Sequence, residues 1–486
     1  MKTLTLFLLP IFILFLAACG ASTPTPTVFP ATVAPAATAQ PAATMPPTAP
    51  PEPTTPPEPT ATPTAAVKAE PTLNPLMATM EALKKKVTVA PATPTGGGQA
   101  AIAPDDYVGM FELAWRIVNE NYVRENFNGV DWNAVHDAYL PKVKAVKSHE
   151  AFWDIMSDMI AELDDHHSRF VPPDRFAAEF DLPSEGSGKP WPGMTVWPAR
   201  EDDYLFIWDV CEYGGASDAG LQRGDIILAI DGEKVTKTEF GFPRSLTHKI
   251  YTGDGKIDLT VLQGPDQEPQ NVTVTYGDAS GCDGWSVATV SDHPYVGYIR
   301  VPEYSGDAAS NILETIEMLE KDRPLDGLIY DERHNPGGNS DASIAIFTTG
   351  VFGKEGKLRK DATMTTWRIR GPVKWSETTP MVVLTDGASH SAAEYFATAM
   401  KQSGRATLVG MPTAGNTEGI TGFSLPDGSI IRLAVMTLVL PDGKTMEGTG
   451  VIPDVKVPLD KWGLHQQPDV QLQKAIDVVL KKIDQR

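Results

Sequence analysis

The chain lacks the short motifs that mark several common enzyme classes. It has no HExxH pattern and no cysteine cluster, and its nine histidines are scattered. It also has no phosphate-binding P-loop, no dinucleotide-binding glycine fingerprint and no G-x-S-x-G pattern. We therefore expect no metal site and no organic cofactor.

Positively charged residues are also fewer than negatively charged ones, with 41 Lys and Arg against 62 Asp and Glu. The formal net charge is −21, which argues against a nucleic-acid partner because phosphates require a basic face. We interpret the acidic balance as a contribution to solubility. The 486 residues are enough for two or three domains, and 42% hydrophobic and 21% charged residues are typical of soluble globular proteins.

The first nineteen residues carry a lysine, Lys2, and then an apolar run from Leu6 to Ala17. The run is short for a spanning helix and typical of a signal peptide. It ends in LAACG, which resembles a bacterial lipobox and implies that Cys19 becomes the lipid-modified first residue. We therefore expect an exported protein anchored to the extracytoplasmic side of the bacterial cell membrane. An uncleaved anchor helix is the alternative, and it predicts the same compartment.

Most of the 42 prolines precede residue 100, and residues 20–104 are rich in Pro, Thr and Ala. Such a composition cannot bury a core, so we predict a disordered linker, with at most a transient helix over Leu76 to Val89. As a coil, it would span roughly 50 Å and hold the folded part away from the membrane.

Residues 105–185 form a predicted helical segment. Apolar residues recur there at helical spacing, namely Phe152, Ile155, Met156, Met159, Ile160 and Leu163. We expect this segment to stop at the sequence DDHHSRFVPP, because Pro172 and Pro173 cannot continue a helix.

Residues 186–280 have strand-like runs, Leu205 to Trp208 and Ile226 to Ile230, and the string ASDAGLQRGDIILAIDG. This region resembles a PDZ domain. The resemblance places the carboxylate-binding loop for a peptide C-terminus at Gly193, Met194, Thr195 and Val196. A β-rich domain without a ligand is the alternative. Cys211 and Cys282 could form a disulfide after export or remain two buried thiols.

Residues 281–486 alternate strands and helices, which predicts an α/β core with covered strands. We expect strands at 296–301, 328–331, 381–384 and 407–409, and helices at 308–320, 342–352, 391–402 and 470–483. A longer strand from Ile430 to Leu440 would close the sheet.

Two sites in this core suggest chemistry. Ser391 lies between a strand and a helix, where free N–H groups can stabilise a developing anion, although serine is also a common helix N-cap. After another strand, Gly337 and Gly338 let the backbone approach a carbonyl oxygen, although an ordinary turn would contain the same residues.

Together these segments resemble the C-terminal processing (tail-specific) and tricorn-type serine peptidases. The landmarks are the NPGG loop, the S-x-S-x-x-E helix start, the GRATLVG strand and the closing GTGVIPDVKV. The resemblance implies a crotonase-like (ClpP/crotonase) α/β spiral core, with an N-terminal helical segment and an inserted PDZ-like β-rich domain. It implies Ser391 as the nucleophile, with Ser389 at a non-catalytic position. It also implies an oxyanion hole formed by the N–H of Ala392 and an N–H of Gly337 or Gly338.

The tail-specific branch places a lysine base in the loop after the GRATLVG-type strand, and Asn416 falls at that position here. Lys401 lies too far along its helix to replace that lysine. The tricorn-like branch instead uses a histidine and a glutamate, for which His167 and Glu447 are the counterparts. We therefore predict a Ser391, His167 and Glu447 triad.

Alternatives remain for several of these residues. His166 is the rival base. His390 and His334 are interpreted as residues of the rim or of the cleft lining, and Glu394 is interpreted as a structural partner. Glu447 could equally be a surface carboxylate.

The leading functional prediction is an endopeptidase that cleaves exported or unfolded polypeptides, selected through their C-termini if the PDZ-like domain captures them. A catalytically inactive peptide-binding protein, motivated by Asn416, is the second hypothesis. A hydrolase of a non-peptide acyl bond is the third. The sequence does not predict the oligomeric state.

Overall fold

The computed structural model describes residues 73–75, 102–165, 167–173, 190–198, 204–211, 214–236, 249–250, 253, 255–277, 284–360, 362–459, 462–465 and 469–486. All described residues belong to one compact unit, which spans residues 68–486. The predicted signal peptide, Cys19 and the possible helix over residues 76–89 lie outside the described residues.

Helices and strands alternate over much of residues 281–486, as the sequence pattern predicts. The described helices are α1 (Tyr107–Asn121), α2 (Trp132–Ala145), α3 (His149–Ala161), α5 (Gly215–Asp218), α7 (Ala308–Leu319), α8 (Asp341–Phe347), α9 (Ala392–Gln402) and α10 (Val470–Asp484), with 3₁₀ turns η2 (Phe127–Gly129) and η3 (Gly463–His465). The described strands are β1 (Leu73–Pro75), β2 (Arg169–Val171), β3 (Met194–Pro198), β4 (Leu205–Val210), β5 (Ile226–Ile230), β6 (Glu233–Lys234), β7 (Lys256–Leu262), β8 (Gln270–Thr275), β9 (Ser286–Val290), β10 (His293–Arg300), β11 (Gly327–Asp331), β12 (Gly350–Gly356), β13 (Thr365–Ile369), β14 (Met381–Thr385), β15 (Thr407–Gly410), β16 (Gly419–Ser424), β17 (Ile430–Val439) and β18 (Val455–Lys456).

The core is a seven-stranded sheet with the order β1-β9-β10-β11-β14-β15-β18. Strands β10, β11, β14, β15 and β18 run parallel, and β9 and β1 add antiparallel strands at one edge. Because the carboxyl ends of the parallel strands share one edge, the loops that follow β11 and β14 meet there. Those two loops hold the glycine pair and Ser391.

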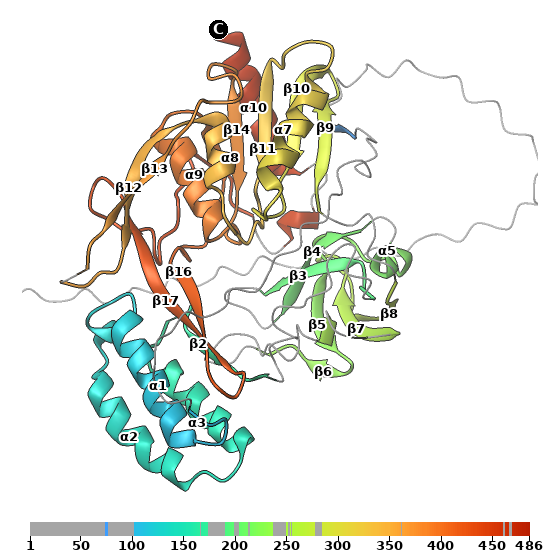
Figure 1. Ribbon diagram of the computed structural model, residues 1–486. Helices are drawn as coiled ribbons and strands as arrows, with labels where there is room; N and C mark the ends of the chain where they lie inside the picture. Colours follow the sequence, from blue (N-terminus) through green and yellow to red (C-terminus); the bar gives the residue numbers. More distant parts are fainter. Residues whose placement is uncertain are drawn as a thin grey trace, which may run out of the picture. The chain divides into compact units, whose positions relative to one another are not determined.

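Helices cover both faces of this sheet (Figure 1). All five residues of β11 are buried, and their side chains alternate between the two layers. Leu328 and Tyr330 join the cluster formed with α7, α8 and α9, whereas Ile329 joins the cluster formed with α10. This two-sided burial explains why the strand is a continuous apolar run rather than an alternating one.

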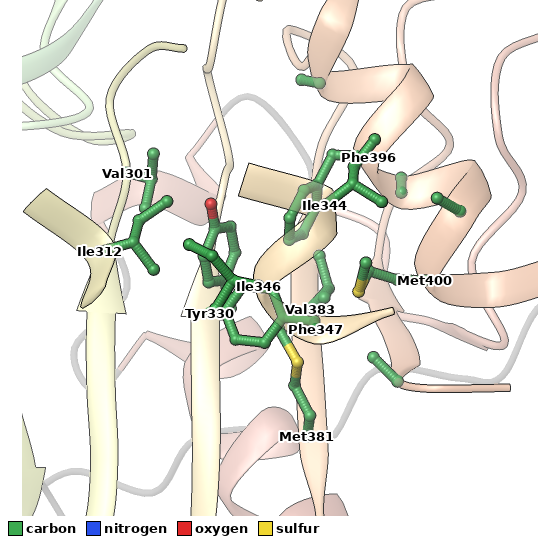
Figure 2. Packing of buried hydrophobic residues seen from close by; sticks show 14 of the residues in the cluster. Val301, Ile312, Tyr330, Ile344, Ile346, Phe347, Met381, Val383, Phe396 and Met400 are labelled. Atoms are coloured by element: carbon green, nitrogen blue, oxygen red, sulfur yellow. The ribbon is translucent and has the colours of Figure 1, made fainter. Parts of the chain in front are cut away.

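The α8–α9 side of the core is packed with aromatic rings. Figure 2 shows Phe347 and Phe396 beside Tyr330 and Val383. The rings of Tyr330 and Phe396 stack with centroids 4.6 Å apart. The helix that begins at Ser391 is therefore fixed against the sheet by large buried side chains.

A second sheet has the order β13-β12-β17-β16, and β2 also pairs with β17 (Figure 1). The prediction that the strand at 430–440 closes the main sheet is therefore wrong. That strand, β17, forms antiparallel pairs with β16, β12 and β2 instead. The pairing with β2 brings the segment near residue 170 to this second sheet.

A third, six-stranded sheet contains β3-β4-β5-β7-β8, with β6 paired to β5. The predicted strands at 205–208 and 226–230 are confirmed as parts of β4 and β5. The sheet has its own hydrophobic cluster, which includes Met194, Ile207 and Ile227. Cys211 is disulfide-bonded, and Cys282 lies outside the described residues.

The N-terminal helices form as the apolar spacing predicts, but their end differs. Phe152, Met156, Met159 and Ile160 are buried on α3, which ends at Ala161 rather than at the proline pair. Residues 169–171 then form β2, because their backbone pairs with β17. This strand was not anticipated from the sequence.

Two further boundaries differ from the prediction. The helix predicted at 342–352 ends at Phe347, and β12 begins at Gly350. A short strand, Leu73–Pro75, lies within the predicted linker and pairs with β9. In the part of the chain that the structure describes, no helix has both the length and the apolar character needed to cross a membrane.

Candidate active site

Ser391 has a backbone conformation that an ordinary helix N-cap does not have. Its φ is 56° and its ψ is −122°, whereas an N-cap residue normally lies in the β region. A positive φ costs a non-glycine residue about 1–3 kcal/mol and persists only where the surroundings impose it. A serine held in such a strand-to-helix turn presents its hydroxyl outward, as in nucleophile elbows. The conformation therefore favours a functional role for Ser391 over a simple cap.

Glu394 holds this turn in place. Its carboxylate is fully buried and accepts hydrogen bonds from the Ser391 N–H at 3.1 Å and from the N–H groups of Gly415 and Asn416 at 2.7 and 2.9 Å. The Thr413 hydroxyl donates a fourth at 2.6 Å. Burial raises the pKa of Glu394 although these donors oppose the shift. The structure is consistent with the prediction that Glu394 is a structural partner.

The glycine pair lies directly against this turn. A Cβ atom on Gly337 would lie 2.7 Å from both the Ala392 nitrogen and the Ser391 Cβ, so only glycine fits there. The Gly337 N–H donates to the Asn335 side chain at 2.8 Å. Among the described residues, the N–H groups of Ala392 and Gly338 have no such partner. Both N–H groups are therefore unpaired in the described structure, and that of Ala392 follows Ser391 directly in the chain.

His167 and Glu447 meet as the family resemblance implies. His167 Nε2 lies 2.9 Å from Glu447 Oε1, and the histidine side chain is 2% exposed. The other ring nitrogen, Nδ1, is buried without a hydrogen-bond partner in the described structure. In the described structure, the Ser391 hydroxyl and the His167 ring do not form a hydrogen bond. Hydrogen bonds between catalytic groups are often long in the free enzyme and shorten only when substrate binds.

The sheet that contains β17 positions His167. The Ser168 hydroxyl accepts a hydrogen bond from the Ala434 N–H of β17 at 3.1 Å and donates to Asp165 at 2.9 Å. The Asp165 carboxylate also accepts the His167 N–H at 2.8 Å. The histidine backbone is thereby fixed immediately before β2 begins.

Glu447 is fixed from its other side. Its second oxygen accepts hydrogen bonds from the Thr417 N–H at 2.9 Å and from the Thr417 hydroxyl at 3.0 Å. Burial opposes the charge of Glu447, but the bonds from His167 and Thr417 outweigh it and lower the pKa of this carboxyl. Burial likewise opposes the charged ring of His167, but Glu447 outweighs burial and raises the pKa of the imidazole. The pair is therefore built to stabilise an imidazolium.

Two residues of the site were not predicted from the sequence. Glu418 is buried and forms an ion pair with Arg124, whose NH1 atom lies 3.1 Å from Glu418 Oε2. Glu418 stands two residues after Asn416, and no motif marks it. Burial raises its pKa to about 7, and the charge of Glu447 adds to that shift while Arg124 opposes it.

The ligand atoms of His167, Glu418 and Glu447 lie within 4.8 Å of one another, which is close enough to hold a metal ion. Arg124 already supplies a positive charge at Glu418, and His167 and Glu447 already share a hydrogen bond. A second cation would be repelled by the guanidinium. We therefore do not assign these three residues as metal ligands.

The other candidate bases do not replace His167. His166 lies outside the described residues. His390 points its Nδ1 at the Ala388 carbonyl, 2.9 Å away, and His334 stacks on Trp208 with ring centroids 4.1 Å apart. Burial lowers the pKa of both rings. The charge of His167 also contributes to the lowered pKa of His390.

The remaining candidates near the serine have structural partners. Lys401 donates to the Ile452 carbonyl at 2.7 Å and pairs with Asp454 at 2.9 Å. Ser389 is fully buried and donates to the Glu332 carbonyl at 2.8 Å. Asn416 accepts the Ser391 N–H through its own backbone carbonyl at 2.8 Å.

The predicted carboxylate-binding loop lies at the edge of the six-stranded sheet. Gly193 has a φ of +79°, and its carbonyl accepts the Cys211 N–H at 2.8 Å. Met194, Thr195 and Val196 belong to β3, the terminal strand in the sheet order. A role of this loop in peptide binding stays a prediction.

A strained serine on an α/β core, with Gly337 against its turn and a His–Glu pair in the same domain, resembles the arrangement in serine-type hydrolases. Residues 295–457 match peptidase family S41, and residues 103–161 match the tricorn protease C1 domain. The chain therefore contains a peptidase family S41 domain, and relatives that match it are named carboxyl-terminal-processing proteases. The family predicted from the sequence is thereby confirmed.

Named relatives share most of the chain. A carboxyl-terminal-processing protease of Synechocystis sp. is 28% identical over 398 residues, which cover 79% of this chain and 89% of that protein. Tricorn protease homolog 1 of Streptomyces coelicolor is 24% identical, covering 77% of this chain and 35% of that protein.

Solved structures share the fold. The photosystem II D1 C-terminal processing protease has a TM-score of 0.57 at 23% identity, covering 75% of this chain and 99% of that one. Mature CPAF has a TM-score of 0.55 at 13% identity, covering 79% of this chain and 98% of that one. These likenesses show a mixed α/β peptidase fold, and the crotonase-like spiral remains a prediction.

Proposed function

We propose that this S41 peptidase is a Ser-His-Glu endopeptidase of exported or unfolded polypeptides, with Ser391 as nucleophile, His167 as general base and Glu447 as the group that orients the imidazole. The observation that most directly supports this proposal is the 2.9 Å hydrogen bond between His167 Nε2 and Glu447 Oε1. This bond fixes a proton on Nε2 and leaves the buried Nδ1 as the acceptor.

The reaction follows from these positions. Nδ1 of His167 takes the proton of Ser391 while the serine oxygen attacks the scissile carbonyl carbon. The imidazolium then donates that proton to the leaving amine, and the C–N bond breaks. Water, deprotonated by the same ring, hydrolyses the acyl-serine and restores the enzyme. Glu447 stabilises the imidazolium in both halves of the reaction.

The oxyanion would be held by the N–H groups of Ala392 and Gly338. Ala392 is the first residue of α9, so its N–H has no partner within the helix and lies at the positive end of the helix dipole. The Gly337 N–H already donates to Asn335, which favours Gly338 as the second donor. Gly337 then contributes by leaving room beside Ser391.

A fluorophosphonate probe tests the nucleophile. The full-length protein in detergent should be labelled, and Ser391→Ala should not be labelled. Ser403→Ala is the matched control, because Ser403 lies at the other end of α9 and bonds to the Ala399 carbonyl at 2.6 Å. Labelling that survives Ser391→Ala would disprove the assignment.

The alternative of an inactive binding protein depends on Asn416, which replaces the lysine of the tail-specific branch. The bond between His167 and Glu447 supplies another base, so the loss of lysine does not require loss of activity. Hydrolysis of small esters without cleavage of an unstructured peptide would instead support the non-peptide acyl hydrolase.

We also propose that the six-stranded sheet is a PDZ-like domain that selects substrates through their C-termini. Strand β3 is terminal in its sheet, so a peptide can add beside it, with its carboxylate near Gly193. A quenched peptide substrate with a free C-terminal carboxylate should have a lower KM than its amidated twin at the same kcat. Equal KM values would contradict selection through the carboxylate.

The site of action remains a proposal as well. We propose that the chain is exported and held at the outer side of the membrane by lipid on Cys19, with the proline-rich segment as its tether. The apolar run and the LAACG sequence support this assignment.

A further inference from the structure

Glu418 is a buried carboxylate beside the His–Glu pair that the triad itself does not use. Its side chain is 0% exposed, and its ligand atom lies within 4.8 Å of those of His167 and Glu447. Its partner is Arg124, which follows α1 in a distant part of the sequence. A buried ion pair beside a reacting imidazole must affect the stability of the positive charge that the imidazole acquires on protonation.

The position of Arg124 is fixed independently of Glu418. The Val123 N–H donates to the Ala434 carbonyl of β17 at 2.9 Å. The Glu125 N–H donates to the Leu358 carbonyl at 3.3 Å, and the Leu358 N–H donates to the Val123 carbonyl at 2.8 Å. The backbone on both sides of Arg124 is therefore held, so the arginine side chain starts beside the site without depending on its ion pair with Glu418.

We propose that Glu418 is a positioning residue that neutralises Arg124, so that the cluster of Arg124, Glu418, Glu447 and His167 carries no net positive charge when the ring has accepted the proton of Ser391. This inference rests on the proposed Ser-His-Glu mechanism and identifies a residue that supports it. Glu418 touches no reacting atom and acts through the imidazole.

The charge count shows why this residue matters. With Arg124, Glu418 and Glu447 ionised, the cluster has a net charge of −1 while His167 is neutral and of 0 when it is protonated. Without the charge of Glu418, protonation of His167 would change the net charge of this buried cluster from 0 to +1. A buried net charge is costly, so the imidazolium would be less stable.

Other charged and titratable groups also surround the pair. The charges of Glu447, Glu418 and Asp165 raise the pKa of His167. The pKa of Glu418 is affected by the charges of Arg124, Glu447 and His167. The charge of Glu418 in turn affects the pKa values of Tyr122 and Tyr395, and Arg124 also affects that of Tyr122. The charge of His167 affects the pKa of His390. Of these neighbours, Arg124 is the permanent cation, and Glu418 is its ion-pair partner. The pKa of Glu418, raised to about 7 by burial, makes it predominantly charged on the alkaline side of neutrality, where a neutral imidazole can act as base.

A charge-balance cycle tests the proposal on the full-length protein in detergent. The variants are Glu418→Gln, Arg124→Gln and the double variant, each assayed with a quenched unstructured peptide from pH 5 to 10. Glu418→Gln should lower kcat/KM by up to about 10-fold and move the acid limb about one pH unit lower, because one pKa unit of the imidazolium corresponds to a factor of ten. In the double variant, the net charge of the cluster again changes from −1 to 0 when His167 is protonated. Its kcat/KM should therefore recover to within a few-fold of wild type, and the midpoint of the acid limb should return to the wild-type pH.

A second measurement does not depend on peptidase activity. In protein labelled with ¹⁵N-histidine and carrying Ser391→Ala, NMR titration should show a lower midpoint for His167 when Glu418→Gln is added. The midpoint should return towards the parent value when Arg124→Gln is also present. If the probe labels no serine but this shift appears, the proposed function fails while the electrostatic coupling stands.

Asp326→Asn is the matched control, because it breaks an exposed Arg323–Asp326 pair without touching the site. It should leave the pH profile unchanged. A double variant as impaired as Glu418→Gln would show that the pair acts only by packing and would overturn the proposal. An unchanged His167 midpoint in Glu418→Gln would overturn it as well.

Discussion

His167 Nε2 lies 2.9 Å from Glu447 Oε1, although 280 positions separate the two residues in the sequence. Two pairings make this contact possible. Strand β2 pairs with β17 immediately after His167, and Thr417 binds the free oxygen of Glu447. His167 is thus contributed by the N-terminal segment, and its partner Glu447 is contributed by the last part of the core.

Replacing Glu447 by glutamine should remove the charge that stabilises the imidazolium. We expect kcat/KM for a quenched peptide to fall by about 10³-fold or more, because an amide also favours the wrong ring tautomer. Asp442→Asn, a change at an exposed carboxylate nearby in sequence, is the control and should keep wild-type activity. An active Glu447→Gln enzyme would exclude the triad.

The pH dependence of kcat/KM should report the His167 ring. The ring must be neutral to accept the serine proton, and its pKa is raised above the ordinary value of 6.5. A raised pKa keeps the ring protonated to higher pH, so the acid limb should have its midpoint above 6.5. A pH–rate profile checks this, and a midpoint below that value would argue against His167 as the base.

The sequence was sufficient to predict the parallel strands β10, β11, β14 and β15 and the helices α7, α9 and α10 of the core. Buried parallel strands such as β11 are continuous apolar runs, and α3 and α9 repeat apolar residues at helical spacing. The predicted contact between His167 and Glu447 came from the family resemblance, not from periodicity. No local pattern brings these two residues together.

What the sequence could not predict depends on pairing between distant segments. Strand β2 exists because residues 169–171 bond to β17, and nothing in its three residues requires a strand. The same holds for the assignment of β17 to its own sheet and for the ion pair of Arg124 with Glu418. The positive φ of Ser391 is likewise imposed by tertiary contacts through Glu394.

Gly337 should tolerate no side chain. In Gly337→Ala, the new methyl group would lie 2.7 Å from the Ala392 nitrogen, so we expect kcat to fall at least about 100-fold. Gly371→Ala is the matched control, because Gly371 also has a positive φ, +113°, but has open space around its Cα. Both variants should lose about 1 kcal/mol or more of stability from the strained φ, and only Gly337→Ala should lose activity.

Cys19 should determine how the chain is anchored. Cys19→Ser should abolish incorporation of an alkyne fatty acid and move most of the protein into the soluble fraction, because the lipid chains supply the affinity for the membrane. Fractionation of cells that express each form checks this. A variant that loses the label but stays in the membrane would favour the uncleaved anchor helix.

Glu394 should be needed for stability as well as for rate. Glu394→Ala would leave four donors without their common acceptor in a buried site, so we expect a loss of about 3–5 kcal/mol in the free energy of unfolding. Urea unfolding measures this, and Glu317→Ala, at an exposed position of α7, should stay within about 0.5 kcal/mol of wild type. Because the same carboxylate imposes the strained turn, the folded fraction of Glu394→Ala should also react more slowly with the fluorophosphonate. Unchanged labelling of that fraction would mean that the conformation of Ser391 is maintained by other contacts, such as its bond to the Asn416 carbonyl.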